Sequence, residues 1–430
     1  MSPRKASVSY PLPLAEPEEV GLSSERLARV GPVMKKYIDR RMVPHIVTLV
    51  ARHGKLVHYE AQGYLDLDSK KPAGTDTIVR LWSNSKCIAG LATMICVEDG
   101  LLTLDDPVSK YIPAFKNPVV LATSVPPEGP RPPMGAMPTV PAVREITVRD
   151  CLRNTTGLMS QQRAPVQLIA AYRDVVAKLG WLTGPLVAAH SVQELVEAQA
   201  KLPLYCQPGT QFEYHVGYLA LGLVLEAATG KTLEEFYQER IFKPLGMKDT
   251  SFYLLPGRMP QFSTCYRPSR KTGEWQLIVE DKPADSEKVK GPKTFFGAGG
   301  DRGGLLSTAG DYARFAQCLL NGGELDGVRI IGRKSVELMT SNHTAEGVYP
   351  PMRGPAFGFG MGVGVYKGGG LPILESVGTY GWGGAAGTNY FGDPKEDLIA
   401  IIFSQVFMHT MMPGNLYQED FQRLVYQALI

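Results

Sequence analysis

The chain lacks a long hydrophobic run, a strong net charge and a secretory leader. No apolar stretch approaches the roughly 18 residues that a membrane-spanning helix needs, so we expect no membrane partner. The 45 basic and 42 acidic residues nearly cancel over 430 positions, which gives no electrostatic footprint for nucleic acid. The N-terminal segment is polar and proline-rich and has no apolar signal core. The sequence therefore predicts a cytoplasmic protein.

Motifs for metal and cofactor binding are also missing. The six cysteines are scattered without a C-x-x-C pair, and their mostly apolar neighbours predict reduced core thiols. H-E-x-x-H, zinc-spaced Cys/His sets and G-x-G-x-x-G do not occur. Gly230-Lys231-Thr232 imitates the end of a P-loop, but Leu225 stands where that motif needs glycine. The sequence therefore implies no metal and no organic cofactor.

Two common routes to serine hydrolysis are excluded as well. The nucleophile elbow G-x-S-x-G is absent, which argues against an α/β-hydrolase. Seven histidines are present, but none stands in a recognisable triad signature. A hydrolase with this sequence would need a different base.

Hydrophobic periodicity predicts strands near both ends of the chain. A hairpin is expected over residues 45–60, with Gly54 in its turn, and strand-like runs occur at 357–365, 386–392 and 398–404. These runs favour one antiparallel sheet built from both termini, which is an α+β architecture with an inserted all-α block. We expect residues 1–80 and 290–430 to form the sheet domain and residues 81–289 the helical domain, with the active site at their interface.

Helix signals cluster in the middle of the chain. Apolar side chains recur at helical spacing between Ile88 and Cys96, and Gly100 can end that helix. Capping-box spacing occurs at Thr147 and Asp150, at Ser191 and Glu194, and at Thr232 and Glu235. Further helices are expected after Ser23, after Thr308 and near the C-terminus. Residues 255–300 are irregular and polar in pattern, so we expect loops there.

The first candidate catalytic element is the S-x-x-K sequence Ser83-Asn84-Ser85-Lys86, at the start of the apolar helix. Helical spacing puts the Lys86 amine one turn from the Ser83 hydroxyl on the same face. A lysine made neutral by burial can take the serine proton, which a solvated lysine cannot. Alone the motif is weak, because chance supplies one or two in such a chain and Ser83 could be a simple helix cap.

Two further elements lie later in the chain. Tyr214 follows a Pro-Gly turn and precedes a helix, and a tyrosine beside a lysine can act as a general base. A glycine-rich segment, residues 381–387, enters a strand. On an edge strand such glycines allow close approach of a substrate and leave backbone N–H groups free. Taken alone, the first of these elements is better explained as a packing tyrosine and the second as a tight hairpin.

In combination the three elements resemble the serine β-lactamase and penicillin-binding superfamily. Supporting stretches look similar, namely V-E-D-G-L-L-T-L-D-D-P-V at 97–108 and T-V-R-D-C-L-R-N-T-T-G-L at 147–158. The resemblance runs from about residue 20 to the C-terminus. It implies a β-lactamase-like fold with catalytic Ser83, Lys86 and Tyr214, and an oxyanion hole from the N–H groups of Ser83 and Ala385.

Departures from the superfamily pattern indicate which branch of the superfamily the chain resembles. The usual Y-x-N ends in Val216, and the usual K-T-G reads Trp382-Gly383-Gly384. The cation that recognises a substrate carboxylate is therefore replaced by an aromatic ring. This W-G-G looks like the family VIII carboxylesterases, with lovastatin-type acyltransferases as near relatives. Arg302 and Arg314 lie in segments that could bring a substitute cation to the site.

We therefore predict a serine hydrolase that cleaves short, neutral carboxylic esters through an acyl-enzyme on Ser83. The resemblance implies substrate-binding roles for Trp382, Gly383, Gly384 and Val216. The expected partner is a small-molecule ester, and self-association is left open. Three alternatives remain, namely an acyltransferase with the same acyl-enzyme, a weak β-lactamase or amidase, and a catalytically inactive binding relative.

Overall fold

The computed structural model describes residues 10–122, 138–158, 192–214, 217–271, 273–289, 304–369 and 373–430. The strands of its main sheet are β12 (Phe357–Phe359), β13 (Gly364–Tyr366), β14 (Tyr380–Gly384), β15 (Thr388–Asp393), β16 (Leu398–Phe403), β1 (His45–Arg52), β2 (Lys55–Asp66) and β3 (Lys71–Pro72). The principal helices are α1 (Ser24–Leu27), α2 (Val30–Asp39), α3 (Ser85–Glu98), α4 (Val148–Leu152), α6 (Val192–Ala200), α7 (Gly217–Thr229), α8 (Leu233–Tyr237), α9 (Lys243–Leu245), α10 (Ala309–Leu320), α11 (Arg333–Thr340) and α12 (Tyr417–Gln427).

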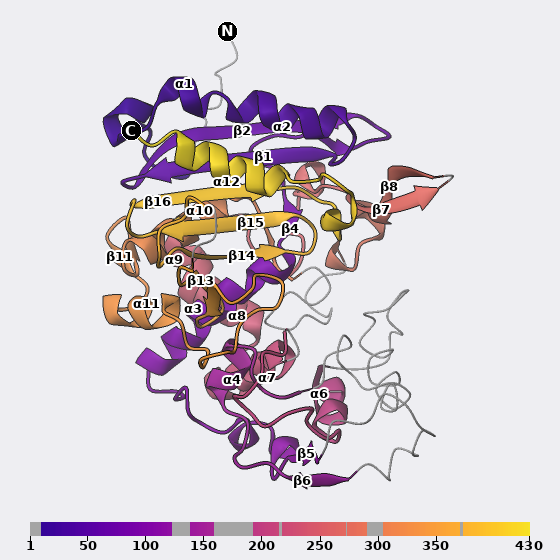
Figure 1. The fold of residues 1–430 in the computed structure, drawn as a ribbon, viewed down its shortest axis with the longest axis vertical. Coiled ribbons are helices and arrows are strands. Elements are labelled where there is room, and N and C mark those ends of the chain that lie inside the picture. Colours follow the sequence, from indigo (N-terminus) through magenta and orange to yellow (C-terminus); the bar gives the residue numbers. More distant parts are fainter. Residues whose placement is uncertain are drawn as a thin grey trace.

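The sheet joins the two ends of the chain, as the sequence predicts. Strand β1 pairs with β2 in the expected N-terminal hairpin, and on its other side it pairs antiparallel with β16, Val47 opposite Phe403. The order β12-β13-β14-β15-β16-β1-β2-β3 places the C-terminal strands on one half of the sheet. Figure 1 shows this arrangement, with indigo β1 and β2 beside yellow β16.

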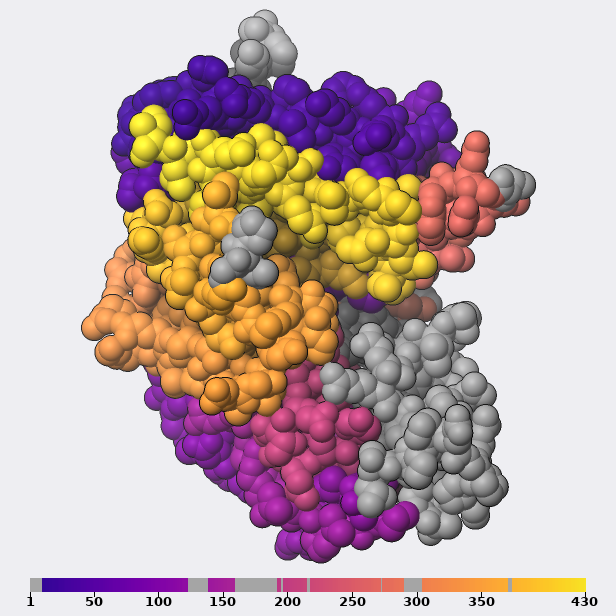
Figure 2. Space-filling model, in the orientation of Figure 1, coloured from indigo at the N-terminus to yellow at the C-terminus, as the bar shows by residue number. Residues whose placement is uncertain are grey.

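Helices cover both faces of the sheet because its strands are apolar on both sides. Along β1, Ile46 and Val50 pack with α2 and α12, whereas Val47 and Leu49 belong to the larger core that contains α3 and α10. The same larger core continues into α4 and α7. Figure 1 shows α4 and α7 below β14 in that view. Figure 2 shows the orange segment near residues 325–370 between yellow and magenta parts of the chain.

Most predicted helix boundaries are confirmed. Thr147 and Asp150 form a capping box on α4, as do Thr232 and Glu235 on α8, and Thr308 caps α10. The pair Ser191 and Glu194 cannot be assessed, since residue 191 lies outside the described residues. All six cysteines are buried, as expected.

Three expectations about strands are wrong. Residues 357–365 form not one strand but the hairpin β12–β13, because the Gly360–Gly362 segment turns where it meets α3. The region 255–300 contains an antiparallel hairpin, β7 (Cys265–Lys271) with β8 (Glu274–Asp281). Strand β14 is not an edge strand, since it lies between β13 and β15.

None of the helices in the described part of the chain is both long and apolar enough to cross a bilayer.

Candidate active site

Ser83 lies in a tight 3-10 turn, η2 (Trp82–Asn84), immediately before α3. Its neighbour Trp82 has a φ of 50°, in the left-handed region that non-glycine residues rarely adopt. The turn is fixed by Leu81, whose N–H donates to Leu305 O at 2.8 Å and whose carbonyl accepts from Thr388 Oγ1 at 2.9 Å. The nucleophile candidate therefore stands on a constrained backbone rather than inside the helix.

Lys86 lies in the first turn of α3 and is fully buried. Its Nζ donates to Ser83 Oγ at 3.2 Å, which is the contact that the S-x-x-K spacing predicts. The same Nζ lies 4.9 Å from the ring centre of Tyr214 and 5.0 Å from that of Tyr218. The buried amine therefore lies between the Ser83 hydroxyl and two tyrosine rings.

Ser85, the other serine of the motif, is fully buried and engaged elsewhere. Its Oγ accepts a hydrogen bond from Leu305 N at 2.9 Å. This bond ties the start of α3 to the segment that precedes β9 (Leu306–Ser307). Ser85 therefore has a structural contact, while Ser83 faces the lysine.

Tyr214 reaches the same place from the helical part of the chain. The preceding residue, Glu213, donates its backbone N–H to Asn154 O at 2.7 Å, which anchors the segment to the loop after α4. The Tyr214 hydroxyl accepts a hydrogen bond from Trp382 Nε1 at 2.7 Å. Since an indole can only donate, the tyrosine oxygen must be the acceptor of this bond.

Trp382 is buried on β14 and connects the sheet to the catalytic tyrosine candidate. Its ring packs edge-on against Phe359, with ring centres 4.9 Å apart. Gly364 on β13 leaves room for the indole, because a Cβ there would come within 2.8 Å of it. The sequence predicted a pocket wall at Trp382, and the structure adds a hydrogen bond to Tyr214.

The glycines of β14 bring the strand close to the nucleophile turn. A Cβ at Gly384 would lie 2.2 Å from Leu81 O, so only glycine permits this approach. Strand β13 pairs with β14 only at Tyr380 and Gly381, so Trp382, Gly383 and Gly384 have no strand partner on that side among the described residues. This open side explains why an interior strand can still present backbone to a ligand.

Ala385 follows β14 in a turn against the same region of the chain. Its carbonyl accepts from Met408 N at 2.7 Å, and within the described residues no acceptor is found for its N–H. This is the condition that an oxyanion-hole donor needs. Val216 lies outside the described residues.

Of the two arginines that the sequence suggested as substitute cations, only Arg314 lies within the described residues. Arg314 is bound by Asp326 and by the carbonyl of Pro11 at 2.8 Å, so its guanidinium is engaged away from Trp382. Arg302 lies outside the described residues. The cation that the structure brings to Trp382 is Arg353, whose Cζ lies 5.8 Å from the ring centre.

Sequence reasoning assigned no role to Tyr218 or Arg353. For Tyr218 a usable signal was its position four residues after Tyr214, in the first turn of α7. No local pattern marked Arg353, which precedes β12 and approaches Trp382 only through the pairing of β12, β13 and β14.

Curated relatives cover most of this chain. Protein Rv1367c of Mycobacterium tuberculosis (strain ATCC 25618 / H37Rv) is 30% identical over 86% of this chain and 88% of its own length. Esterase EstB of Burkholderia gladioli is 27% identical, and the match covers 90% of this chain and 93% of the esterase. A putative D-alanyl-D-alanine carboxypeptidase of Escherichia coli (strain K12) is 26% identical, covering 93% and 87%.

Solved structures show the same fold. EstCE1, described as a hydrolase with promiscuous acyltransferase activity, superposes with a TM-score of 0.74 at 26% identity and covers 94% of this chain and 99% of its own. Simvastatin synthase (LovD) from Aspergillus terreus also superposes with a TM-score of 0.74, at 21% identity. The match covers 94% of this chain and 98% of the synthase. The predicted resemblance and fold class are thereby confirmed.

The family model for beta-lactamase matches residues 32–418. Because this match spans nearly the whole chain, the protein belongs to the beta-lactamase family, a fold family of serine hydrolases and acyltransferases.

Proposed function

We propose that the protein is a serine esterase that forms an acyl-enzyme on Ser83. The observation that carries this proposal is the contact of Lys86 Nζ with Ser83 Oγ at 3.2 Å, beside a Tyr214 hydroxyl held by Trp382. A serine is activated when a base lies within hydrogen-bond reach and a third group orients that base. Here Lys86 is the base and Tyr214 its neighbour.

The proposed reaction has two steps. Ser83 Oγ attacks the ester carbonyl, its proton passes to the Lys86–Tyr214 pair, and the pair protonates the leaving alcohol. The N–H groups of Ser83 and Ala385 stabilise the oxyanion. A water molecule, deprotonated by the same pair, then attacks the acyl-enzyme and releases the acid. Lys86, Tyr214 and Ser83 thus serve both steps.

We also propose the two-part organisation, with residues 1–80 and 290–430 as the sheet domain, 81–289 as the helical domain and the site between them. This division is supported by where the groups come from. Ser83 and Lys86 begin the helical range, Tyr214 follows within it, and Trp382 belongs to the sheet. Deleting or moving one part would therefore separate Trp382 from Tyr214.

The preferred substrates are proposed to be short, neutral esters. Trp382 is buried where β-lactam enzymes of the superfamily place a lysine, so a carboxylate next to the reacting carbonyl meets an indole. Burying such a charge without a partner costs several kcal/mol, and each 1.36 kcal/mol is tenfold in rate. Gly383 and Gly384 on β14 then offer backbone to the uncharged part of the ester.

Kinetics on p-nitrophenyl butyrate and nitrocefin test this preference. We expect kcat/KM for the ester to exceed that for nitrocefin by at least about 100-fold. A panel of p-nitrophenyl esters with wild type and Ser83→Ala shows whether the activity belongs to this serine. Comparable kcat/KM for the two substrates would reject the neutral-ester assignment and favour a β-lactamase or a peptidase. The E. coli relative is described as a putative D-alanyl-D-alanine carboxypeptidase.

An acyltransferase is the second candidate, favoured by the description of EstCE1 as a hydrolase with promiscuous acyltransferase activity. Both reactions share the acyl-enzyme and differ in whether water or an alcohol takes the acyl group. The partition of product between free acid and new ester, measured with added alcohol, separates them. A catalytically inactive relative is disfavoured, since Ser83, Lys86 and Tyr214 are all present and Lys86 Nζ contacts both the Ser83 hydroxyl and the Tyr214 ring.

A further inference from the structure

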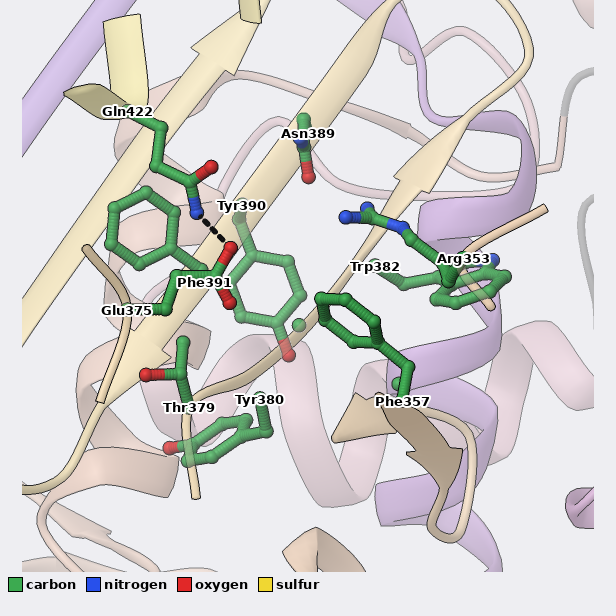
Figure 3. Close-up of a pocket in the computed structure, with 12 residues that line it drawn as sticks. Arg353, Phe357, Glu375, Thr379, Tyr380, Trp382, Asn389, Tyr390, Phe391 and Gln422 are labelled. Carbon is green, nitrogen blue, oxygen red and sulfur yellow. Dashed lines mark hydrogen bonds between the residues drawn. The ribbon is translucent and has the colours of Figure 1, made fainter. Parts of the chain in front are cut away.

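A small pocket lies beside Trp382 and is lined in part by residues of β14 and β15. Its lining includes Arg353, Glu375, Asn389 and Gln422 together with the aromatic rings of Phe357, Tyr380, Trp382, Tyr390 and Phe391. Figure 3 shows the Arg353 guanidinium pointing into this pocket, with Asn389 across from it. The interior volume is about 30 Å³, which suits a group the size of about two water molecules.

Arg353 is held by ring contacts rather than by a carboxylate. Its Cζ lies 5.5 Å from the ring centre of Phe357 and 5.8 Å from that of Trp382. Among the described residues, no acidic side chain comes within ion-pair distance of it. Stacking on aromatic faces orients a guanidinium while leaving its N–H edge for an acceptor. That edge matches the two oxygens of a carboxylate.

The other charged group of the pocket, Glu375, has a partner of its own. Gln422 Nε2 donates to Glu375 Oε1 at 2.6 Å, drawn as the dashed line in Figure 3. Burial raises the pKa of the Glu375 carboxyl, and the hydrogen bond from Gln422 and the positive charge of Arg353 oppose this rise. Asn389, by contrast, offers an amide that can donate to the same anion.

The indole of Trp382 links this pocket to the proposed catalytic groups. Its Nε1 edge contacts the Tyr214 hydroxyl, and its ring contacts Arg353. One indole therefore separates the cation from the catalytic tyrosine. A carboxylate directly beside the reacting carbonyl would meet the ring, but one at the end of a flexible chain could pass the ring and reach the guanidinium.

We infer that Arg353, with Asn389, forms a carboxylate subsite that selects esters carrying an anionic group several bonds from the scissile carbonyl, such as half-esters of linear dicarboxylic acids. This inference rests on the proposed esterase function and refines its substrate class: the ester is neutral around the scissile carbonyl and carries its charge at the far end of the acyl chain. It keeps the discrimination against β-lactams, whose carboxylate lies close to the reacting carbonyl.

Matched substrates test the subsite. The mono-p-nitrophenyl esters of adipic, pimelic and suberic acid are compared with the same compounds capped as ω-methyl esters, and the ratio of kcat/KM, charged over capped, is the readout. For at least one chain length, Arg353→Gln should lower this ratio by at least about tenfold, the size expected for a charge-assisted hydrogen bond. The capped esters should be hydrolysed within about twofold of wild type, because a methyl-capped end offers Arg353 no negative charge to bind.

Two further variants sharpen the result. Arg423→Gln removes an equal charge from neighbouring α12, where Arg423 pairs with Asp420, and should leave the ratio unchanged. Glu375→Gln retains an acceptor for Gln422 but removes the like charge, and should raise the ratio. In wild type the ratio should fall as salt rises, because salt screens the ion pair.

Several outcomes would overturn the inference. A ratio that is unaltered in Arg353→Gln, equally altered in Arg423→Gln, or independent of salt in wild type would show that no local carboxylate site exists. If wild type hydrolysed neither series, the esterase proposal itself would fail. Hydrolysis of the capped esters with an unmoved ratio would reject only the role of Arg353.

Discussion

Lys86 has the geometry of a base and a chemical environment that suits one. It is fully buried, its Nζ is 3.2 Å from Ser83 Oγ, and two tyrosine rings surround it. Lys86→Arg keeps a positive charge but removes the ability to accept a proton near neutral pH. We expect kcat on p-nitrophenyl butyrate to fall by at least about 100-fold. Turnover near the wild-type value would mean that the residue acts only through its charge.

Besides forming a wall of the substrate pocket, Trp382 is a positioning residue in this account, because its indole N–H holds the Tyr214 hydroxyl. Trp382→Phe retains an aromatic wall but removes the donor to the Tyr214 hydroxyl. An oxygen that has lost a donor is harder to ionise, so the acid limb of the kcat–pH profile should move to higher pH. We expect kcat to fall by about tenfold, as for one lost hydrogen bond.

The pH profile separates this role from simple packing. A variant that only loosened the pocket would raise KM and leave the limb in place. Phe359→Leu, which alters the neighbouring ring contact but not the hydrogen bond, is the matched control. A limb that moved equally in both variants would reject a positioning role for the indole.

At the scale of elements, the contact between α3 and the β12–β13 turn holds in place the helix that carries Lys86. A Cβ on Gly90 would lie 2.0 Å from Met361 O, and one on Gly362 would lie 2.4 Å from Lys86 O. Gly90→Ala should therefore lower the free energy of unfolding by at least about 2 kcal/mol, although alanine is the better helix former. Thermal unfolding monitored by circular dichroism measures the change.

Gly31→Ala is the control for this substitution. Gly31 also lies inside a helix, α2, but its Cβ would meet the flexible end of the Glu60 side chain rather than backbone, at 2.8 Å. We expect this variant to keep or gain stability. Equal losses at both positions would contradict the claim that the backbone contact of α3 is specific.

The elements that the sequence predicts well are those with local signals. The β1–β2 hairpin has its turn glycine, and α4, α8 and α10 have capping threonines. Residues 357–365 were misread because glycines alternating with apolar residues mimic one strand. The turn inside that segment is imposed by α3, which is distant in sequence.

The candidate site shows the same division between local and distant information. The contact of Lys86 with Ser83 could be predicted because the S-x-x-K motif is local, and Tyr214 became a candidate because the combination of motifs resembles a family. The hydrogen bond from Trp382 to Tyr214 and the approach of Arg353 to Trp382 join segments far apart in sequence. Such contacts depend on strand pairing, which no short motif encodes.

Across the whole molecule, buried histidines link stability to pH. His45 is fully buried, and burial lowers its pKa to about 4, below the ordinary value of 6.5. Because the folded pKa is depressed, the contribution to stability is complete above pH 6.5 and is lost as pH falls toward 4. Between pH 7 and pH 5 this histidine alone should lower the free energy of unfolding by about 2 kcal/mol.

His45→Gln tests the linkage by difference. Other titrating groups cancel when the variant and wild type are compared, so the variant should lose about 2 kcal/mol less stability over the same pH range. Urea unfolding at the two pH values gives the comparison. Parallel losses in both proteins would show that His45 does not titrate in this range.

The central claim is that Ser83 becomes acylated, and covalent labelling tests it most directly. A p-nitrophenyl phosphonate reacts with an activated serine and stays attached, and mass analysis of the peptides locates the adduct. We predict one adduct, on Ser83, together with loss of both labelling and esterase activity in Ser83→Ala. Ser85→Ala should still be labelled, since Ser85 Oγ bonds Leu305 N rather than Lys86. An adduct on Ser85, or esterase activity that survives in Ser83→Ala, would contradict the account.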